Sequence, residues 1–287
     1  MFAHRLEEDA PVRPGIDGKV AVVTGAGHGI GRASAWRLST EGARVVVVDL
    51  DGDAARAVAA SLPTDAVSVQ GDVSQESTID AYMEAGIDRF GRVDLHHLNA
   101  GISGSLAAIP DLTADDFDTV IGVNLRGVFL GLRAAFRHYR DREATGAIAI
   151  TASIASLRGS ADLLPYQTSK HGVLGLLHGG AVYGGPLGIR VNAVAPGIVP
   201  TELFAAAATA SGGKNDMTIR ASTTPLRRAG TPDDIAGVVL FLLSDDAAYV
   251  TGECVSADGG AAIVSSVRPS GGAGAWDFRA ADQRMYG

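Results

Sequence analysis

A tyrosine and a lysine stand four residues apart, at Tyr166 and Lys170. Residues i and i+4 share one face of a helix, and Pro165 is typical of a first helical turn, so the sequence predicts a helix over 165–182. An ammonium group beside a tyrosine hydroxyl favours the ionised phenol. We therefore expect Lys170 to lower the pKa of Tyr166 from its usual value of about 10, which makes the pair a candidate general acid/base.

A glycine-rich segment, Thr24-Gly25-Ala26-Gly27-His28-Gly29-Ile30-Gly31, lies about 140 residues upstream of this pair. It follows an apolar run and opens a helical pattern. In that context, backbone N–H groups and a helix N-terminus bind a pyrophosphate. The residues expected to contact a dinucleotide here are Gly25, Gly27, His28, Gly29, Ile30 and Gly31.

Asp49 ends the next predicted strand, 18 residues beyond Gly31. A carboxylate at this position accepts hydrogen bonds from the adenosine ribose and repels a 2′-phosphate. Leu50 and a second acid, Asp51, follow it, and no Lys or Arg comes before Arg56. The sequence therefore predicts NAD rather than NADP, and His28 is the one nearby group that weakens this preference.

The composition narrows the classes of protein that need to be considered. The chain has 287 residues, of which 46% are hydrophobic, and a net charge of −8. The acidic balance argues against a nucleic-acid partner. No uncharged apolar run reaches 18 residues, so we expect no membrane-spanning helix, and residues 1–14 lack the apolar core of a signal peptide. A single cysteine, Cys254, fits a reducing cytoplasm.

Short apolar runs alternate with helical patterns along the chain. Strands are expected at 19–23, 44–48, 66–69, 93–98, 147–151, 190–194 and 255–256, and helices at 30–39, 53–61, 75–90, 114–141, 165–182 and 232–243. This alternation predicts a single Rossmann-like, doubly wound parallel sheet of about seven strands with helices on both faces. The expected layout is an N-terminal extension (1–17), a dinucleotide-binding and catalytic domain (18–264) with a substrate-side lid (202–228), and a C-terminal tail (265–287).

With these motifs in this order, the chain resembles the short-chain dehydrogenase/reductase family over nearly all of residues 19–263. The match continues through Gly71-Asp72-Val73, Asn99-Ala100-Gly101, Val123-Asn124-Leu125, Thr151-Ala152-Ser153, Pro196-Gly197-Ile198-Val199-Pro200-Thr201, Tyr249-Val250-Thr251-Gly252 and Asp258-Gly259-Gly260. Ser153 precedes Tyr166 by the family's 13 residues. The chain departs from the pattern at Val182-Tyr183-Gly184, where many relatives carry a glutamate.

The resemblance implies hydride transfer to or from a nicotinamide, coupled to proton transfer at Tyr166. It implies that Lys170 binds the nicotinamide ribose, that Ser153 orients the substrate oxygen, and that Asn124 passes the proton toward solvent through water. The further cofactor contacts that it implies are Asp72, Val73, Asn99, Ala100, Gly101, Tyr166, Lys170, Pro196, Gly197, Val199 and Thr201.

By their positions in the chain, the residues expected to line the substrate pocket are Ile102, Ser103, Ala155, Leu163, Leu164, Leu203 and Phe204. Each of them could equally be a core residue. These residues are mostly apolar and include no fixed cation. A neutral secondary alcohol or ketone, cyclic or aromatic, is therefore favoured over a carboxylate or phosphate.

Two other functions remain open at this point. One is a related enzyme that dehydrogenates a cyclic diol or epimerises a hydroxyl group, and the other is a non-catalytic dinucleotide sensor. The complete set of Asn124, Ser153, Tyr166 and Lys170 argues against a sensor. We expect no metal site, because His96 and His97 are neighbours on a strand and point to opposite faces. The surfaces 114–141 and 165–184, which pair between subunits in the family, predict a homotetramer.

Overall fold

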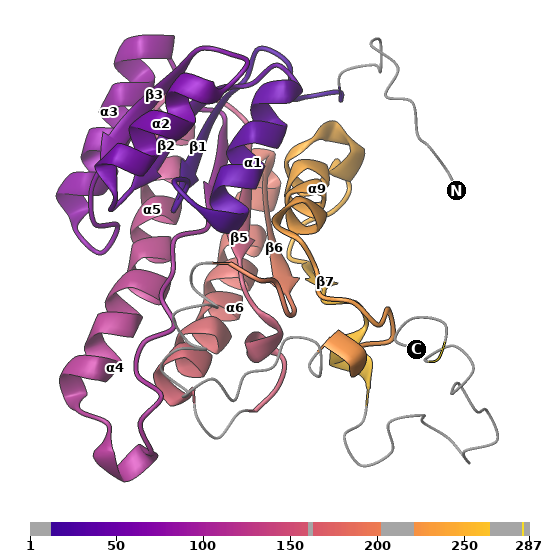
Figure 1. Cartoon of the computed structure of the whole chain (residues 1–287). Coiled ribbons are helices and arrows are strands. Elements are labelled where there is room, and N and C mark those ends of the chain that lie inside the picture. The colour runs from indigo at the N-terminus through magenta and orange to yellow at the C-terminus, as the bar shows by residue number, and fades with distance from the viewer. Residues whose placement is uncertain (1–12, 160–162, 202–220, 265–282, 284–287) are drawn as a thin grey trace.

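The computed structural model describes residues 13–159, 163–201, 221–264 and 283 (Figure 1). Most of the predicted lid, including Leu203 and Phe204, lies outside the described residues. The same holds for most of the N-terminal extension and for all of the tail from 265 onward except residue 283.

The described residues form a seven-stranded sheet with the strand order β3-β2-β1-β4-β5-β6-β7, and every neighbouring pair of strands is parallel. The strands are β1 (Val20–Thr24), β2 (Arg44–Asp49), β3 (Ala66–Gln70), β4 (Leu95–Leu98), β5 (Gly146–Thr151), β6 (Ile189–Pro196) and β7 (Cys254–Ala257). The predicted Rossmann-like fold is confirmed.

Helices cover both faces of this sheet (Figure 1). They are α1 (Gly29–Thr40), α2 (Gly52–Ser61), α3 (Glu76–Phe90), α4 (Ala114–Ile121), α5 (Gly127–Asp141), α6 (Leu164–Gly184) and α9 (Pro232–Leu243). Buried side chains of α1, α2 and α9 share one hydrophobic core with the sheet, and those of α3, α5 and α6 pack in two clusters on the other side.

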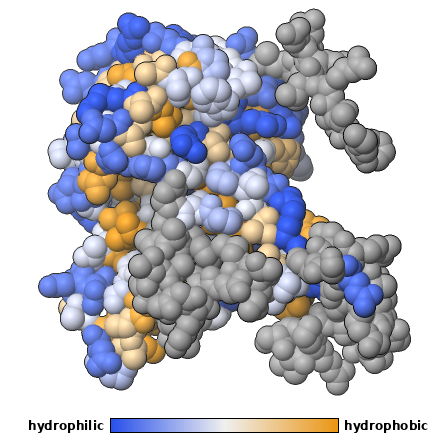
Figure 2. All heavy atoms as spheres, in the orientation of Figure 1, coloured by the Kyte–Doolittle hydropathy of each residue, from blue (hydrophilic) through white to orange (hydrophobic). Residues whose placement is uncertain are grey.

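The sequence forms a doubly covered sheet because its strands have no polar face. Val45 to Val48 in β2 are four consecutive β-branched residues, and each is fully buried. Side chains of successive strand residues point to opposite faces, so such a run needs helices on both sides. In the view of Figure 2, hydrophobic residues form small patches among hydrophilic ones over the part of the chain that contains β1 to β3.

The predicted helix over 114–141 is interrupted by a π-helical segment, Gly122–Arg126, between α4 and α5. π-helical turns occur mostly as single bulges, frequently at functional sites.

Among the described residues, Ala114–Asp141 is also the one helical run long and apolar enough to cross a membrane, and 44% of its most apolar window is buried inside the protein. The core helix of a globular domain meets the same criterion, so the match carries little weight.

The topology sets where a ligand can bind. The connections leaving β1 and β4 run to opposite sides, toward β2 and toward β5 respectively. Ligands of open parallel sheets bind at the carboxyl ends of the strands, beside such a switch point. The predicted nucleotide loop directly follows β1, and Asn99 directly follows β4.

Candidate active site

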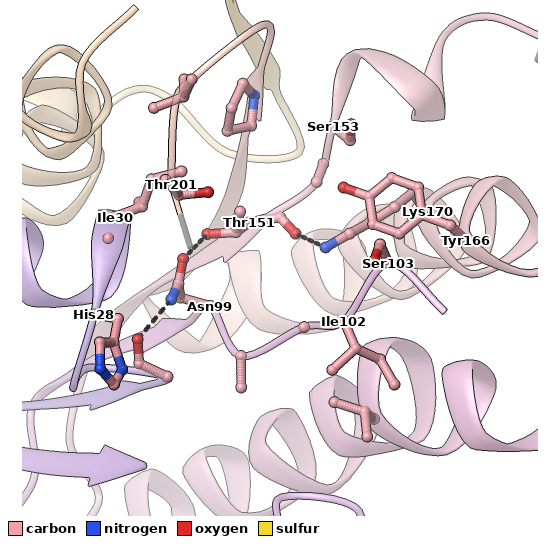
Figure 3. Close-up of a pocket in the computed structure, with 18 of the residues that line it drawn as sticks. His28, Ile30, Asn99, Ile102, Ser103, Thr151, Ser153, Tyr166, Lys170 and Thr201 are labelled. Atoms are coloured by element: carbon pink, nitrogen blue, oxygen red, sulfur yellow. Dashed lines mark hydrogen bonds between the residues drawn. The ribbon is translucent and has the colours of Figure 1, made fainter. Parts of the chain in front are cut away.

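A cleft of about 840 Å³ lies at the carboxyl ends of the strands, within the range of roughly 300–1,000 Å³ that is usual for small-molecule sites. The glycine-rich loop, Asp49 and Asp72 line one end of it, and Ser153, Tyr166 and Lys170 line the other. Figure 3 shows the same arrangement, with His28 and Ile30 on the loop side and Tyr166 and Lys170 across the cleft. The fold therefore brings the two sequence motifs into one site.

The glycine-rich loop is shaped for a close approach by a ligand. Gly25 has φ of +63° and Gly29 of +46°, a region that favours glycine. A methyl group added at Gly31 would collide with the carbonyl oxygen of Gly25. His28 is the N-cap of α1, its side chain does not cap the helix, and the first turn has no acidic residue. The helix N-terminus is therefore free to bind an anion such as a pyrophosphate.

Asp49 holds this loop in place. Its Oδ2 accepts a hydrogen bond from Gly27 N at 2.8 Å, and its Oδ1 accepts one from Asp51 N at 3.0 Å. Gly27 and Gly31, both predicted cofactor contacts, do not line the cleft, whereas Gly25, His28, Gly29, Ile30, Asp49 and Leu50 do. The role of Gly27 in the structure is thus to donate its N–H to Asp49.

The middle of the cleft is lined by further residues that the sequence singled out. They are Asp72, Val73, Asn99, Ala100, Gly101, Pro196, Gly197, Val199 and Thr201. Asn99 Nδ2 donates to the carbonyl oxygens of Thr24 at 3.0 Å and of Gly25 at 3.3 Å, so it ties β4 to the nucleotide loop. Sequence reasoning gave no role to Thr151, which lines the cleft at the end of β5.

The three reactive side chains come from two elements. Ser153 lies just after β5, and Tyr166 and Lys170 lie one turn apart on α6. Ser153 Oγ accepts a hydrogen bond from Ala155 N at 3.1 Å, and the Ser153 side chain is also hydrogen-bonded to Tyr166. Lys170 Nζ donates to the carbonyl oxygen of Thr151 at 2.7 Å and lies 5.7 Å from the centre of the Tyr166 ring (Figure 3).

The pKa values at this end of the cleft differ from the expectation. Burial raises the pKa of Tyr166, and its hydrogen bond with Ser153 opposes that rise without cancelling it. Lys170 is 3% exposed, and burial lowers the pKa of its ammonium to about 8. The predicted lowering of the Tyr166 pKa by Lys170 is therefore wrong for the protein without a bound dinucleotide, because desolvation of the phenolate dominates. In this state, Tyr166 is a neutral phenol and a proton donor.

Asn124 lies in the π-helical segment and is fully buried behind the cleft rather than lining it. Its Oδ1 accepts from Ile102 N at 2.8 Å, and its Nδ2 donates to Ile102 O at 2.9 Å and to Ser169 Oγ at 3.1 Å. A methyl group added at Gly101 would lie 3.2 Å from Asn124 Oδ1 and 3.7 Å from Lys170 Nζ. The amide and the ammonium therefore flank one small space.

The apolar end of the cleft differs in part from the predicted substrate wall. Ile102, Ser103, Ala155 and Leu163 line the cleft, and Leu106 and Ile154 do so as well, although no motif pointed to them. Leu164 does not line it and is exposed. The physical reason is local: Leu164 is the first residue of α6, and the side chain of its N-cap, Leu163, occupies the cleft wall instead. Leu203 and Phe204 lie outside the described residues.

The two histidines of β4 are both fully buried. Within the described part of the chain, no cluster of three or more His, Cys, Asp or Glu side chains has the arrangement of a metal site.

The fold and the cleft define a dinucleotide-fold enzyme, and comparisons with known proteins identify its family. A family model described as "Enoyl-(Acyl carrier protein) reductase" matches residues 25–262. The chain is 38% identical to levodione reductase of Leifsonia aquatica over 250 residues, which cover 84% of this chain and 93% of that protein. It is 40% identical to momilactone A synthase of Oryza sativa subsp. japonica over 256 residues, which cover 87% of this chain and 92% of the other.

Solved structures agree with the sequence comparisons. The crystal structure of levodione reductase superimposes with a TM-score of 0.83 at 37% identity, over 87% of this chain and 99% of that one. A 3-ketoacyl-(acyl-carrier-protein) reductase from Brucella melitensis, complexed with NADH, gives a TM-score of 0.79 at 33% identity, over 86% and 99%. The chain belongs to the short-chain dehydrogenase/reductase family, whose members are oxidoreductases that use NAD or NADP.

Proposed function

We propose that the protein is an NAD-dependent oxidoreductase that interconverts a neutral, cyclic or aromatic secondary alcohol and its ketone. The observation that supports this most strongly is the single cleft with Tyr166, Lys170 and Ser153 at its apolar end and the glycine-rich loop at the other. When bound, the nicotinamide supplies or accepts the hydride, so the chain's own residues need to hold the substrate and move one proton.

The preference for NAD rests on charge. Asp49 and Asp72 line the loop side of the cleft, and Lys170 is the one Lys or Arg among the described lining residues, at the opposite, catalytic end. A 2′-phosphate near Asp49 would meet a carboxylate with no Lys or Arg to offset it. The related reductase solved with NADH supports the same choice.

The proton chemistry follows from the hydrogen bonds. In ketone reduction, Tyr166 gives its proton to the substrate oxygen. The Ser153 hydroxyl, which is hydrogen-bonded to Tyr166 in the absence of substrate, orients and polarises that oxygen. Lys170 uses one of its three protons on Thr151 O, so two remain for the ribose hydroxyls and for the phenolate that forms. In alcohol oxidation, the same phenolate is the general base. Acid–base assistance of this kind contributes about 10²–10⁴-fold to the rate.

The path for the proton beyond Lys170 leads past Gly101. Asn124 Oδ1 has a second lone pair beside its bond to Ile102 N, and it faces the same small space as Lys170 Nζ. We propose that a water in this space passes the proton toward solvent.

The substrate class is inferred from the apolar wall. Ile102, Leu106, Ile154 and Leu163 line the catalytic end. A fixed negative charge on the substrate would be desolvated there, because Lys170, the one cation among the described lining residues, is engaged by Thr151 O, the ribose and the phenolate. The similarity to an enzyme named levodione reductase supports reduction as one direction of the reaction.

The experiment is an initial-rate assay at the absorbance band of reduced nicotinamide, with NAD and with NADP, over a panel of cyclic, aromatic and aliphatic secondary alcohols and their ketones. Turnover that prefers NAD and neutral cyclic substrates supports the proposal. Turnover that is faster with NADP, or only with carboxylate or phosphate substrates, contradicts it.

We also propose that the protein is a cytoplasmic homotetramer that pairs through α5 and α6. Exposed apolar side chains on and just after these helices support this, namely Phe129, Val182, Tyr183 and Leu187. A monomeric mass by light scattering would refute the assembly.

A further inference from the structure

His96 and His97 are adjacent, equally buried histidines in β4, but they have different surroundings. His96 contacts Tyr139 edge-on, with ring centres 5.8 Å apart, and neither of its ring nitrogens has a hydrogen-bond partner among the described residues. His97 points to the opposite face, where its Nε2 lies 2.9 Å from Thr151 Oγ1. One histidine is therefore a packing residue, and the other belongs to a polar network.

The donors and acceptors in this network have a fixed order. Asn99 Nδ2 donates to the carbonyl oxygens of Thr24 and Gly25, so Asn99 Oδ1 must face Thr151, whose hydroxyl donates to it at 2.9 Å. That bond uses the only proton of the Thr151 hydroxyl. Thr151 Oγ1 must then accept from His97, which makes His97 the tautomer with the proton on Nε2.

The same residues close a ring across three strand ends. Thr24 Oγ1 accepts from Asn99 N at 2.9 Å and from Ala100 N at 3.1 Å, and it donates to His97 O at 3.5 Å. The ring joins the carboxyl ends of β1, β4 and β5. Gly25, Asn99, Ala100 and Thr151 line the cleft, whereas His97 does not. His97 can therefore affect a ligand only through its neighbours.

We propose that His97 is a positioning residue for the dinucleotide, which acts through the Thr151 hydroxyl and the Asn99 amide on the carbonyls of the nucleotide loop. The proposal rests on the dinucleotide site proposed above. Without the donor on His97, the Thr151 hydroxyl can rotate away from Asn99, and the amide that fixes the start of the loop loses its support. Buried hydrogen-bond chains of this kind strengthen each member.

The protonation state of His97 is compatible with this role. Burial lowers the pKa of His97 to about 3, so the ring is neutral throughout an ordinary assay range and carries one proton. The network decides which nitrogen holds it. The effect of replacing His97 should accordingly be the same at pH 6 and at pH 8.

The test compares His97→Leu and His97→Gln with a matched control, His96→Leu, by fluorescence titration with NADH and NADPH and by thermal unfolding. His97→Leu should weaken binding of the preferred dinucleotide about 3- to 10-fold, which corresponds to the loss of one neutral hydrogen bond, and change kcat less than about twofold. Glutamine places an N–H donor near the position of Nε2 and should restore binding to within about twofold. His96→Leu, which removes an equally buried ring, should bind as wild type does.

Several results would overturn the inference. If wild type binds the dinucleotide and His97→Leu binds it equally well, His97 is only a packing residue. If His96→Leu weakens dinucleotide binding as much as His97→Leu does, His97 is likewise only a packing residue. If His97→Leu does not fold, Thr151→Val tests the network from its other end, because it removes the hydroxyl that joins His97 to Asn99. It should weaken dinucleotide binding at least about 3-fold, and unchanged binding would overturn the inference. If wild type binds neither dinucleotide, the proposed function fails and this inference fails with it.

Discussion

Two substitutions of Asp49 separate the effect of its charge from that of its hydrogen bonds. Asp49 accepts from Gly27 N at 2.8 Å and from Asp51 N at 3.0 Å. Asparagine removes the charge but keeps one carbonyl oxygen, which can still accept from Gly27. Alanine removes the charge and both acceptors, so the nucleotide loop loses its side-chain anchor to β2 and keeps only the backbone bond from Ala26 N to Val48 O.

The expected magnitudes follow from simple electrostatics. Two unit charges about 4–6 Å apart interact by about 3–4 kcal/mol at an effective dielectric constant of about 20. Asp49 is half-buried, so we halve this value for solvent screening and expect kcat/KM for NADP to rise about 10- to 30-fold in Asp49→Asn. In Asp49→Ala, the Gly27 N–H loses its partner, which costs about 1–2 kcal/mol. The alanine variant should therefore be about 5- to 30-fold less efficient than the asparagine variant with either dinucleotide.

The assay measures kcat/KM for NAD and NADP with one alcohol substrate at low ionic strength and again at about 0.5 M salt. High salt should reduce the difference in kcat/KM for NADP between wild type and Asp49→Asn, because it screens the repulsion between the Asp49 carboxylate and the 2′-phosphate. The reasoning is refuted if Asp49→Ala uses NADP as well as Asp49→Asn does, because the bond to Gly27 would then contribute nothing.

Three further predictions follow from the structure. Because burial raises the pKa of Tyr166, the phenol is neutral at neutral pH, so the rate of alcohol oxidation should climb from pH 6 to about 8, where Lys170 begins to lose its charge, while ketone reduction is retained at pH 6–7. Oxidation that is independent of pH over this range would contradict this. Gly101→Ala places a methyl group 3.7 Å from Lys170 Nζ, in the space proposed for the water. Under substrate saturation, kcat should fall at least about 10-fold, while dinucleotide binding changes less than threefold. An unchanged kcat would exclude the proposed proton path. Tyr139→Phe removes the buried hydrogen bond from the Tyr139 hydroxyl to Asp94 O, which is 2.9 Å long. The free energy of unfolding, measured in urea, should fall by about 1 kcal/mol. A decrease below about 0.3 kcal/mol would show that the bond is not stabilising.

Much of the fold could be predicted because its signals are local. The run Val45–Val48 is β-branched and fully buried, and such a run in a chain that alternates strands with helices indicates a parallel sheet. Thr231 and Asp234 form the capping box that begins α9, and this helix has the bounds predicted for it, 232–243. The spacing of Tyr166 and Lys170 placed them on one helical face, and the structure has them on α6.

The features that sequence reasoning missed depend on contacts between distant residues. The hydrogen bond from Gly27 N to Asp49 joins residues 22 positions apart, and no local sequence pattern predicts it. The π-helical turn at 122–126 joins α4 to α5 without a break in the helical run, so the sequence predicts one continuous helix. The sequence singled out His97 only as a possible metal ligand, and its partner Thr151 is 54 residues away.

The most direct test of the central claim is a single-turnover measurement on Tyr166→Phe. This variant keeps the ring and removes the proton that Tyr166 is proposed to transfer. With a ketone that wild type reduces, oxidation of bound NADH should slow by about 10²–10⁴-fold, while the dissociation constant of NADH stays within about threefold of wild type. A variant that retains more than about a tenth of the wild-type rate would show that Tyr166 is not the general acid/base.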